Sequence, residues 1–438
     1  MSEALKEIIL DFQETDWPTG TPRRLEVSTL PGKATICIGP RRSGKSTFLF
    51  QLIRRLTDRG VPRENILYLN FFDDRLRHLQ QEGLAGVSEA YFSLYPEKHG
   101  TDTLYCFFDE IQVIPGWEPF VDRMMRTERC EIYITGSSAK MLSSEIATEM
   151  RGRALSWELL PFSLREFLDF KGIESDGPLS TQRRRLVARA LDDYWEIGGF
   201  PEVAALSRPL RIKVHQEYWE AMLFRDLVER HDIAHPRAVV DLGHRLVDNT
   251  ASLYSLNRLT GYLKSIGHRA PKSAVRDYVD WFEDAFFLFS VRIFDASLAR
   301  AQTNPKKIYC IDHSLVRSVS SGILVNSGHL LENLVFTGLR RVTPNIFYYK
   351  SKAGLEVDFV AEMNDRSRLL VQVCESLADP ATLKREVAAL DDAMAALDEC
   401  SGVIVTRDDA SRAGHDEIKV GSGTIRVSPA WRFLLDLS

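Results

Sequence analysis

A glycine-bounded loop near residue 40 carries the residue types of a phosphate-binding site. Residues 39–46 read Gly-Pro-Arg-Arg-Ser-Gly-Lys-Ser, which matches the pattern G-x-x-x-x-G-K-[ST]. Gly39 and Gly44 allow a tight turn that brings backbone N–H groups onto phosphate oxygens. Lys45 is expected to reach the β- and γ-phosphates of a nucleotide, and the Ser46 hydroxyl to bind Mg²⁺. The residues expected to contact the nucleotide are Gly39, Pro40, Arg41, Arg42, Ser43, Gly44, Lys45, Ser46 and Thr47.

A pair of acids follows an apolar stretch at residues 104–108. Downstream of a phosphate-binding loop, this pattern predicts that Asp109 belongs to the Mg²⁺ shell and that Glu110 polarises the attacking water. Many strands end in a solvated acid, so the pair alone would be weak. Its interpretation depends on the loop that precedes it.

A second apolar stretch, residues 131–136, ends at Ser137 and Ser138. A polar side chain at such a strand tip could sense the γ-phosphate or the attacking water, and Ser137 is the first candidate. An ordinary Gly-Ser turn after the strand is the alternative for either serine.

Two arginines, Arg151 and Arg153, precede a further apolar stretch at residues 154–159. An arginine in this place could project across a subunit boundary and stabilise transition-state charge at a neighbour's ATP. A surface arginine without that role is the alternative for each.

The elements that must position these residues alternate between strands and helices. The pattern predicts strands at residues 34–38, 66–71, 104–109, 131–136 and 154–159, and a helix that begins at about Lys45. This alternation is typical of an α/β fold with a parallel sheet and helices on both faces. The phosphates would then bind beyond the carboxyl ends of the strands.

Bulk composition excludes several classes of protein. The chain has 438 residues, 44% apolar and 27% charged residues and a net charge of −5, as expected for a globular protein of several domains. No apolar run approaches the roughly 20 residues of a membrane span, and the N-terminus lacks a secretory signal. The six cysteines are scattered, which favours a reducing cytoplasm over a disulfide framework or a zinc site.

Taken in order, the loop, the Asp109-Glu110 strand, the segment before Ser138 and the two arginines resemble an AAA+-type ATPase. Later motifs narrow the resemblance to a widespread bacterial and archaeal family with a winged helix and a C-terminal domain that resembles restriction endonucleases. These motifs are GGFPE at 198–202, LFRDLVER at 223–230, NPKKIYCID at 304–312, LENLVF at 331–336 and GLEVDFV at 354–360. The resemblance implies an ATPase core at 1–160, a helical lid at 161–236, a winged helix at 237–300 and a nuclease-like α/β domain at 301–438. It also implies either that the glycines at 198–199 bring the lid against the nucleotide or that they form a loop before a helix.

The winged-helix region has a local basic surface. We expect one helix near residues 256–265 and a second that begins near residue 271 or 272. Acids at 277, 280, 283 and 284 argue against deep insertion of the second helix into a DNA groove. The region could therefore contact DNA phosphates, or could serve only for packing between domains. The five candidate DNA-binding residues are Arg258, Lys264, Arg269, Lys272 and Arg276.

The C-terminal motifs place Glu332 on a helix and Asp358 on a strand, as in a nuclease site. An active member would carry Glu-x-Lys on the next strand, where this chain has Gln372 and Cys374. Lys350 or Lys352 could in principle replace the missing lysine. The sequence therefore predicts a degenerate nuclease site at Glu332, Asp358 and Gln372, used for binding DNA or a partner, and no cleavage.

Together these features predict a cytoplasmic, Mg²⁺-dependent ATPase that binds ATP and DNA, branched or junction DNA in particular. Coupling of hydrolysis to rearrangement of a ring or other homo-oligomer follows from the two arginines, which need a neighbouring site. The competing hypothesis is a nucleotide-dependent switch that acts on a protein partner. An ATP-regulated nuclease is the third and least favoured.

Overall fold

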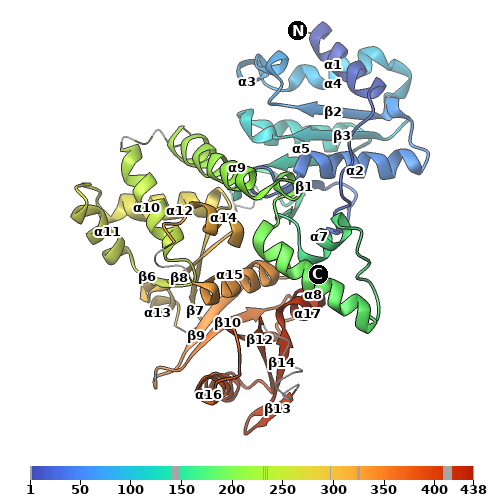
Figure 1. Ribbon diagram of the computed structural model, residues 1–438. Coiled ribbons are helices and arrows are strands. Elements are labelled where there is room, and N and C mark those ends of the chain that lie inside the picture. The colour runs from blue at the N-terminus through green and yellow to red at the C-terminus, as the bar shows by residue number, and fades with distance from the viewer. Residues whose placement is uncertain are drawn as a thin grey trace. The chain divides into compact units, whose positions relative to one another are not determined.

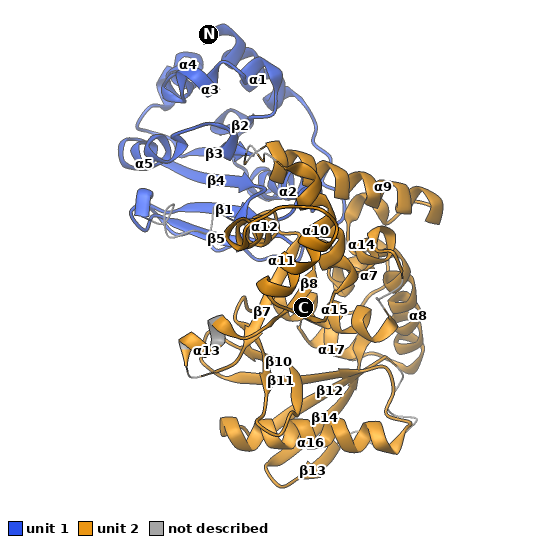
Figure 2. Ribbon diagram, turned by 90° about the vertical axis from the view of Figure 1, so that its left-hand side faces the viewer, with its two compact units in different colours: residues 1–160 blue, residues 161–438 orange. Residues whose placement is uncertain are grey.

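The computed structural model describes residues 2–139, 148–229, 231, 233, 235–295, 297–322, 326–407 and 417–437. The chain divides into two compact units, residues 1–160 and 161–438, each with its own sheet (Figure 2). No helix in the described part of the chain is long and apolar enough to cross a bilayer.

The first unit contains a five-stranded parallel sheet in the order β2-β3-β4-β1-β5. Four of these strands have almost only buried residues, as parallel strands covered on both faces require. The strand order places β4 between β1, which leads into the phosphate-binding loop, and β3, which leads into the acidic pair. The strands are β1 (Ala34–Ile38), β2 (Ile66–Asn70), β3 (Leu104–Asp109), β4 (Cys130–Gly136) and β5 (Ala154–Glu158).

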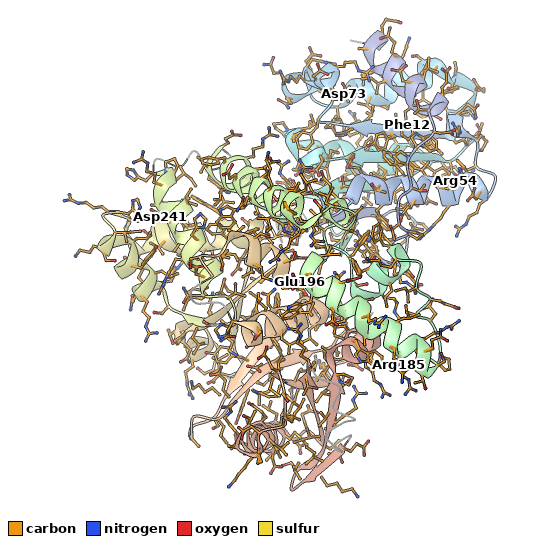
Figure 3. All side chains as sticks on the ribbon, in the orientation of Figure 1. Phe12, Arg54, Asp73, Arg185, Glu196 and Asp241 are labelled. Carbon is orange, nitrogen blue, oxygen red and sulfur yellow. The ribbon has the colours of Figure 1, made fainter. Side chains whose placement is uncertain are left out.

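Helices cover both faces of this sheet (Figure 1). On one face, Phe12 of α1 (Figure 3) stacks on Tyr68 of β2 with ring centroids 4.4 Å apart, and Phe48 of α2 packs in the same cluster. On the other face, Phe120 of α5 packs against Phe108 of β3, with centroids 6.1 Å apart. The helical elements are α1 (Ser2–Glu14), α2 (Lys45–Asp58), η1 (Arg63–Asn65), η2 (Asp74–Leu76), α3 (Leu79–Glu82), α4 (Ala85–Leu94), η3 (Pro96–Lys98), η4 (Ile111–Val113) and α5 (Trp117–Thr127).

The second unit is built on a nine-stranded mixed sheet in the order β13-β14-β12-β11-β10-β9-β7-β8-β6. The apolar stretch at 286–294, in the region expected to form a winged helix, contains β7, which pairs with β8 and, in parallel, with β9, so this region is continuous with the sheet. The strands are β6 (Leu253–Tyr254), β7 (Leu288–Ile293), β8 (Lys306–Cys310), β9 (Ile346–Lys350), β10 (Glu356–Glu362), β11 (Arg368–Cys374), β12 (Ser401–Thr406), β13 (Glu417–Val420) and β14 (Gly423–Pro429).

Two long helices build the core of this second sheet. Phe336 of α15 stacks on Tyr309 of β8 with centroids 4.5 Å apart. Leu390 and Met394 of α16 pack in a separate cluster with Val360 of β10. The helical elements are α7 (Leu164–Phe170), α8 (Thr181–Ile197), η6 (Pro201–Val203), α9 (Arg208–Ala221), the π-helical η7 (Met222–Glu229), α10 (Pro236–Asp248), α11 (Leu256–Ser265), α12 (Lys272–Asp284), α13 (Leu298–Thr303), α14 (His313–Val319), α15 (Ser327–Arg340), α16 (Pro380–Leu397) and α17 (Ala430–Leu437).

The predicted α/β fold with a parallel-sheet core is confirmed, and the structure adds the large second sheet. The predicted helix at 256–265 coincides with α11, and α12 begins at Lys272. The last residue of the motif at 223–230 lies outside the described residues, and the rest of that motif belongs to η7.

Candidate functional site

The phosphate-binding loop connects β1 to α2 at the carboxyl end of the strand. Its two glycines meet different requirements. A Cβ atom at Gly39 would lie 2.2 Å from the backbone oxygen of Leu159, so no side chain fits there. Gly44 precedes α2 with a φ of 92°, a left-handed conformation that glycine adopts without strain. The loop therefore depends on both glycines for its shape.

Lys45, the first residue of α2, is buried inside this loop. Its Nζ atom donates hydrogen bonds to the carbonyl oxygens of Gly39 and Pro40, at 3.1 and 3.0 Å. The same atom lies 3.3 Å from Glu110 Oε1. The ammonium group is thus held at the loop by two neutral acceptors and one carboxylate.

The other loop residues are arranged around this lysine. The Ser43 hydroxyl is buried and has no hydrogen-bond partner within the described residues. Arg41 is half-buried, with its guanidinium 5.6 Å from the ring centroid of Phe72, and Arg42 is exposed with a φ of 63°. Ser46 and Thr47 are half-buried in the first turn of α2.

Asp109, at the end of β3, is held by side chains from both neighbouring strands. The Tyr68 hydroxyl of β2 donates to Asp109 Oδ2 at 2.9 Å, and the Thr135 hydroxyl of β4 donates to Oδ1. Burial raises the pKa of Asp109, against hydrogen bonds from Ser46, Thr135 and Tyr68 that favour the ionised form. The contact with Ser46 brings together the two residues predicted to bind Mg²⁺.

Glu110 adopts a left-handed backbone conformation, with a φ of 56°, that turns the chain after the strand. Its backbone N–H donates to Thr135 Oγ1 at 2.9 Å. Burial acts to raise the pKa of Glu110, but the charge of Lys45 and a hydrogen bond from Gln112 outweigh it, so the pKa is lowered. Glu110 is therefore an ionised carboxylate beside the loop lysine.

Ser137 belongs to the same network. Gln112 Nε2 lies 2.6 Å from Glu110 Oε2 and 3.3 Å from Ser137 Oγ. Ser138 is also buried. The sequence indicated the two serines as sensors of the γ-phosphate or the attacking water but did not indicate Thr135, although it lies in the same motif.

A second residue that the sequence did not indicate, Arg23, supports the phosphate-binding loop. Arg23 is buried, and its guanidinium donates to the carbonyl oxygens of Ser43, at 2.7 Å, and Leu160, at 2.6 Å. Its backbone N–H donates to Gln51 Oε1 of α2 at 3.0 Å. The segment before β1 therefore braces the phosphate-binding loop, a role for which the sequence gives no local pattern.

The two candidate arginines differ in their surroundings. Arg153 pairs with Asp122 of α5 at 3.3 Å, whereas Arg151 is exposed with a φ of 50°. Both precede β5, whose first residue, Ala154, lies opposite Ala34 at the start of β1. The phosphate-binding loop follows the other end of β1, roughly 16 Å along the strand at about 3.3 Å per residue.

The five candidate DNA-binding residues are divided among three places in the second unit. Arg258 and Lys264 are exposed on α11, and Arg269 lines a pocket between the start of α10 and the loop before α12. Lys272 and Arg276 of α12 line a different pocket.

The structure brings the predicted degenerate nuclease residues together and adds a lysine. Lys307 of β8 is buried, and its Nζ lies 3.0 Å from Glu332, 3.0 Å from Glu356 and 2.8 Å from Asp358. The Gln372 side-chain oxygen accepts the backbone N–H of Asp358 at 3.2 Å. The expectation that this site has no lysine is therefore corrected. The lysine comes from a strand that precedes the carboxylates in the chain, and neither Lys350 nor Lys352 supplies it.

Neither of the two lysines considered as replacements reaches this cluster's centre. Lys350 is exposed and pairs with the outer oxygen of Glu356 at 3.3 Å, and Lys352 is exposed in the following turn. Burial and the charge of Asp358 raise the pKa of Glu332, in spite of the nearby Lys307 ammonium. The described residues contain no group of three or more His, Cys, Asp or Glu side chains arranged to hold a metal ion.

The glycines at 198–199 make contacts inside the second unit. The Gly199 N–H donates to Asp312 Oδ2 at 2.7 Å, and its carbonyl accepts from the Phe162 N–H at 2.6 Å. A Cβ atom at Gly198 would lie 2.0 Å from Ser314 Oγ. These contacts explain both glycines without a ligand.

Comparison with known proteins agrees with this geometry. The family described as an AAA domain matches residues 31–168, and two domains of unknown function match residues 188–323 and 327–422. The uncharacterized protein MJ1544 of Methanocaldococcus jannaschii is 32% identical over 440 residues, which cover 98% of this chain and 95% of that protein. The chain belongs to this family of AAA-domain proteins. An uncharacterized protein of Haemophilus influenzae is 30% identical over 339 residues, covering 76% of this chain and 80% of that one.

Among solved structures, the Walker-type ATPase PABY2304 of Pyrococcus abyssi matches with a TM-score of 0.42 and 14% identity, covering 65% of this chain and 90% of that one. The AAA-domain match includes the phosphate-binding loop, the acidic pair and the two arginines. The first unit of this family member is therefore an AAA-type P-loop ATPase domain, as the sequence predicted. The winged helix and the nuclease-like domain remain predictions.

Proposed function

We propose that this protein is a Mg²⁺-dependent ATPase that binds DNA and couples ATP binding and hydrolysis to rearrangement of a homo-oligomer and of the bound DNA. One observation carries the ATPase part of the proposal. Lys45 of the phosphate-binding loop and the ionised Glu110 lie 3.3 Å apart, next to a restrained Asp109.

The loop residues suit a nucleoside triphosphate. The carbonyl oxygens that hold Lys45 are neutral, so its ammonium can transfer to the β- and γ-phosphates, which are stronger acceptors. The buried Ser43 hydroxyl, without a partner among the described residues, and the amides at the start of α2 supply donors for phosphate oxygens.

Ser46 and Asp109 would hold Mg²⁺, which would neutralise charge on the transferred phosphoryl group. Tyr68 and Thr135 fix the orientation of Asp109 for that task. Glu110 would orient and polarise the attacking water, with Gln112 and Ser137 positioning its carboxylate.

An arginine would complete the site from a neighbouring subunit. Arg151 and Arg153 precede β5 at the end of the sheet remote from the phosphate-binding loop of the same chain, so either would act on a second copy. Arg151 is the better candidate because Arg153 is already paired with Asp122. This arrangement is the basis for proposing a homo-oligomer.

The test is ATP turnover measured with no DNA and with single-stranded, duplex and four-way DNA. We expect DNA to stimulate turnover in the wild type and Lys45→Ala to abolish it with every DNA. Mixing Lys45→Ala subunits with Arg151→Ala subunits should restore part of the turnover, because one interface then has an intact loop and an intact arginine. Equal turnover with and without each DNA would overturn the DNA part and favour a nucleotide-dependent switch.

A further inference from the structure

A pocket of about 490 Å³ in the second unit lies next to α12 and the strands β6, β7 and β8. Its volume is within the range of about 300–1,000 Å³ that is usual for ligand sites. Tyr254 of β6 and the first residues of α11 complete its wall. The charged residues that line it are Lys272, Arg276, Asp280, Arg292 and Lys306.

The pocket gathers four cations from three elements. Lys272 and Arg276 lie one turn apart on α12, whereas Arg292 belongs to β7 and Lys306 to β8. Asp280 is the single carboxylate among the lining residues that the structure describes. The pocket is thus strongly cationic although the whole chain has a net charge of −5.

Strand alternation explains why Lys306 faces this pocket. Successive residues of a strand point to opposite faces of the sheet. Lys307 points to the face covered by α15 and is saturated by three carboxylates. Lys306 points to the other face, where Tyr254 lies opposite it in the β6–β8 pair.

The cations of the pocket keep their capacity for an external anion. Within the part of the chain that the structure describes, none of the four has a carboxylate oxygen within 4 Å, in contrast to Lys307. Arg292 is exposed and lies over the ring of Phe347 at 5.5 Å, which orients its guanidinium without neutralising it.

We propose that this pocket binds adjacent phosphates of an unpaired DNA strand. The inference rests on the proposed function, because it names the site and the form of the DNA. Cations on two strands and one helix can contact successive phosphates of one strand that enters the pocket. Asn257 and Asn304 in its wall offer amide groups to the sugar or base.

An unpaired strand suits the pocket better than a duplex laid along α12. After its first turn that helix carries Asp277, Asp280 and Asp284, which would repel a phosphate backbone that follows the helix axis. The two cations at the start of α12 and the two on the strands are instead grouped around one concave site.

The test compares Arg292→Gln/Lys306→Gln with the wild type by fluorescence anisotropy, using a labelled single-stranded oligonucleotide and a duplex of equal length. We expect affinity for the single strand to fall about tenfold near physiological salt, and the slope of log affinity against log salt to decrease by about 0.7 for each lost contact. Equal melting temperatures would show that both proteins are folded.

The matched control is Arg185→Gln/Lys384→Gln, which removes one exposed arginine on α8 (Figure 3) and one exposed lysine on α16. It changes the net charge equally, and we expect its affinity for DNA to match that of the wild type. A fall as large as that of the pocket variant would mean that general charge, not this pocket, binds the strand, and would overturn the inference.

Other outcomes separate this inference from the proposed function. If the wild type binds DNA and the pocket variant binds it equally well, the pocket assignment fails and the DNA-binding ATPase stands. If the wild type binds no DNA, both fail. Tighter binding of the duplex than of the single strand, or displacement of the strand by inorganic tripolyphosphate at equal phosphate concentration, would also overturn the inference.

Discussion

Two buried lysines, one in each unit, show how neighbours decide what a charged side chain can do. Lys45 lies against two carbonyl oxygens and one carboxylate, in a loop shaped by glycines. Lys307 lies within 3.0 Å of three carboxylates and is enclosed by the second sheet and α15. Both ammonium groups are sheltered from water and face oxygen atoms, but Lys45 has one carboxylate beside it and Lys307 has three.

The difference separates a binding lysine from a structural one. Neutral carbonyl groups compensate for lost hydration and leave the charge of Lys45 available for phosphate. The carboxylates around Lys307 use its charge completely, and the lysine in turn allows two acids, Glu332 and Asp358, to be buried together. The predictions below test each side of this contrast.

The largest effect is expected from Lys307→Met. The change leaves Glu332 and Asp358 without a cation, and Glu356 with the exposed Lys350 alone, so the free energy of unfolding should fall by about 3–5 kcal/mol. Urea unfolding followed by circular dichroism measures it, and hydrogen exchange of the α15 amides assigns it to the second unit. The control is Lys306→Met, at the preceding residue of β8, for which a change within about 0.5 kcal/mol is expected. Equal losses for the two variants would contradict a structural role specific to Lys307.

Lys45→Ala should affect stability less than Lys307→Met, because it leaves one carboxylate, Glu110, without its cation, and should have a large effect on chemistry. Removal of one preorganised donor typically costs about 100- to 1,000-fold in rate, and ATP turnover should fall by that factor. The control is Arg54→Ala, an exposed residue on the same helix that pairs with Asp58 (Figure 3). If the Lys45→Ala protein keeps more than a tenth of wild-type turnover, Lys45 is not a lysine whose charge serves phosphate binding.

Replacement of Glu332 by Gln tests the cluster by its pH dependence. Burial and Asp358 raise the pKa of Glu332 in the folded state above its unfolded value. The folded protein therefore binds more protons between the two pKa values, and the contribution of this group to stability declines as pH rises through that window. Between pH 5 and 8 the unfolding free energy of the wild type should fall, relative to Glu332→Gln, by about 1.4 kcal/mol for each unit of pKa shift.

The same measurement on Glu217→Gln, an exposed glutamate of α9, gives the baseline. A constant difference between the wild type and Glu332→Gln across this pH range would mean that Lys307 fully offsets the burial of Glu332.

The smallest effect is expected from Tyr68→Phe. It removes one hydrogen bond to Asp109 and leaves the ring in its cluster. A loss of about 1 kcal/mol corresponds to a roughly fivefold lower turnover at low Mg²⁺. Tyr105→Phe, on the neighbouring strand, should leave turnover unchanged. Identical Mg²⁺ dependence of Tyr68→Phe and the wild type would show that Thr135 alone suffices to hold Asp109.

The binding lysine could be predicted from the sequence because its signal is local. Gly39, Gly44 and Lys45 lie within a few residues of one another, and Glu110 follows a recognisable strand. Thr135 was not predicted because the two serines that follow β4 were the polar residues considered there. The structure shows that the Thr135 hydroxyl donates to Asp109.

The structural lysine could not be found in this way. Its partners Glu332 and Asp358 lie 25 and 51 residues further along the chain, and only the pairing of β8 inside the sheet brings them close. A signal was present nonetheless. Two successive lysines at the start of an apolar strand require one of them to face the interior, where a lysine is rarely found without partners. The predicted set of DNA-binding residues lacked Arg292 and Lys306 for the same reason. These two residues come from strands that lie next to α12 only in the folded chain.

The nine-stranded sheet also decides whether the second unit can be divided into two independent domains. The two stretches that match domains of unknown function, 188–323 and 327–422, meet within that sheet, where β7 of the first stretch pairs with β9 of the second. A fragment that ends at 323 would keep Lys307 and lose all three of its carboxylates, and the complementary fragment would keep the acids alone. The stretches are therefore halves of a single folding module, and shuffling one without the other would leave unbalanced charge in its interior.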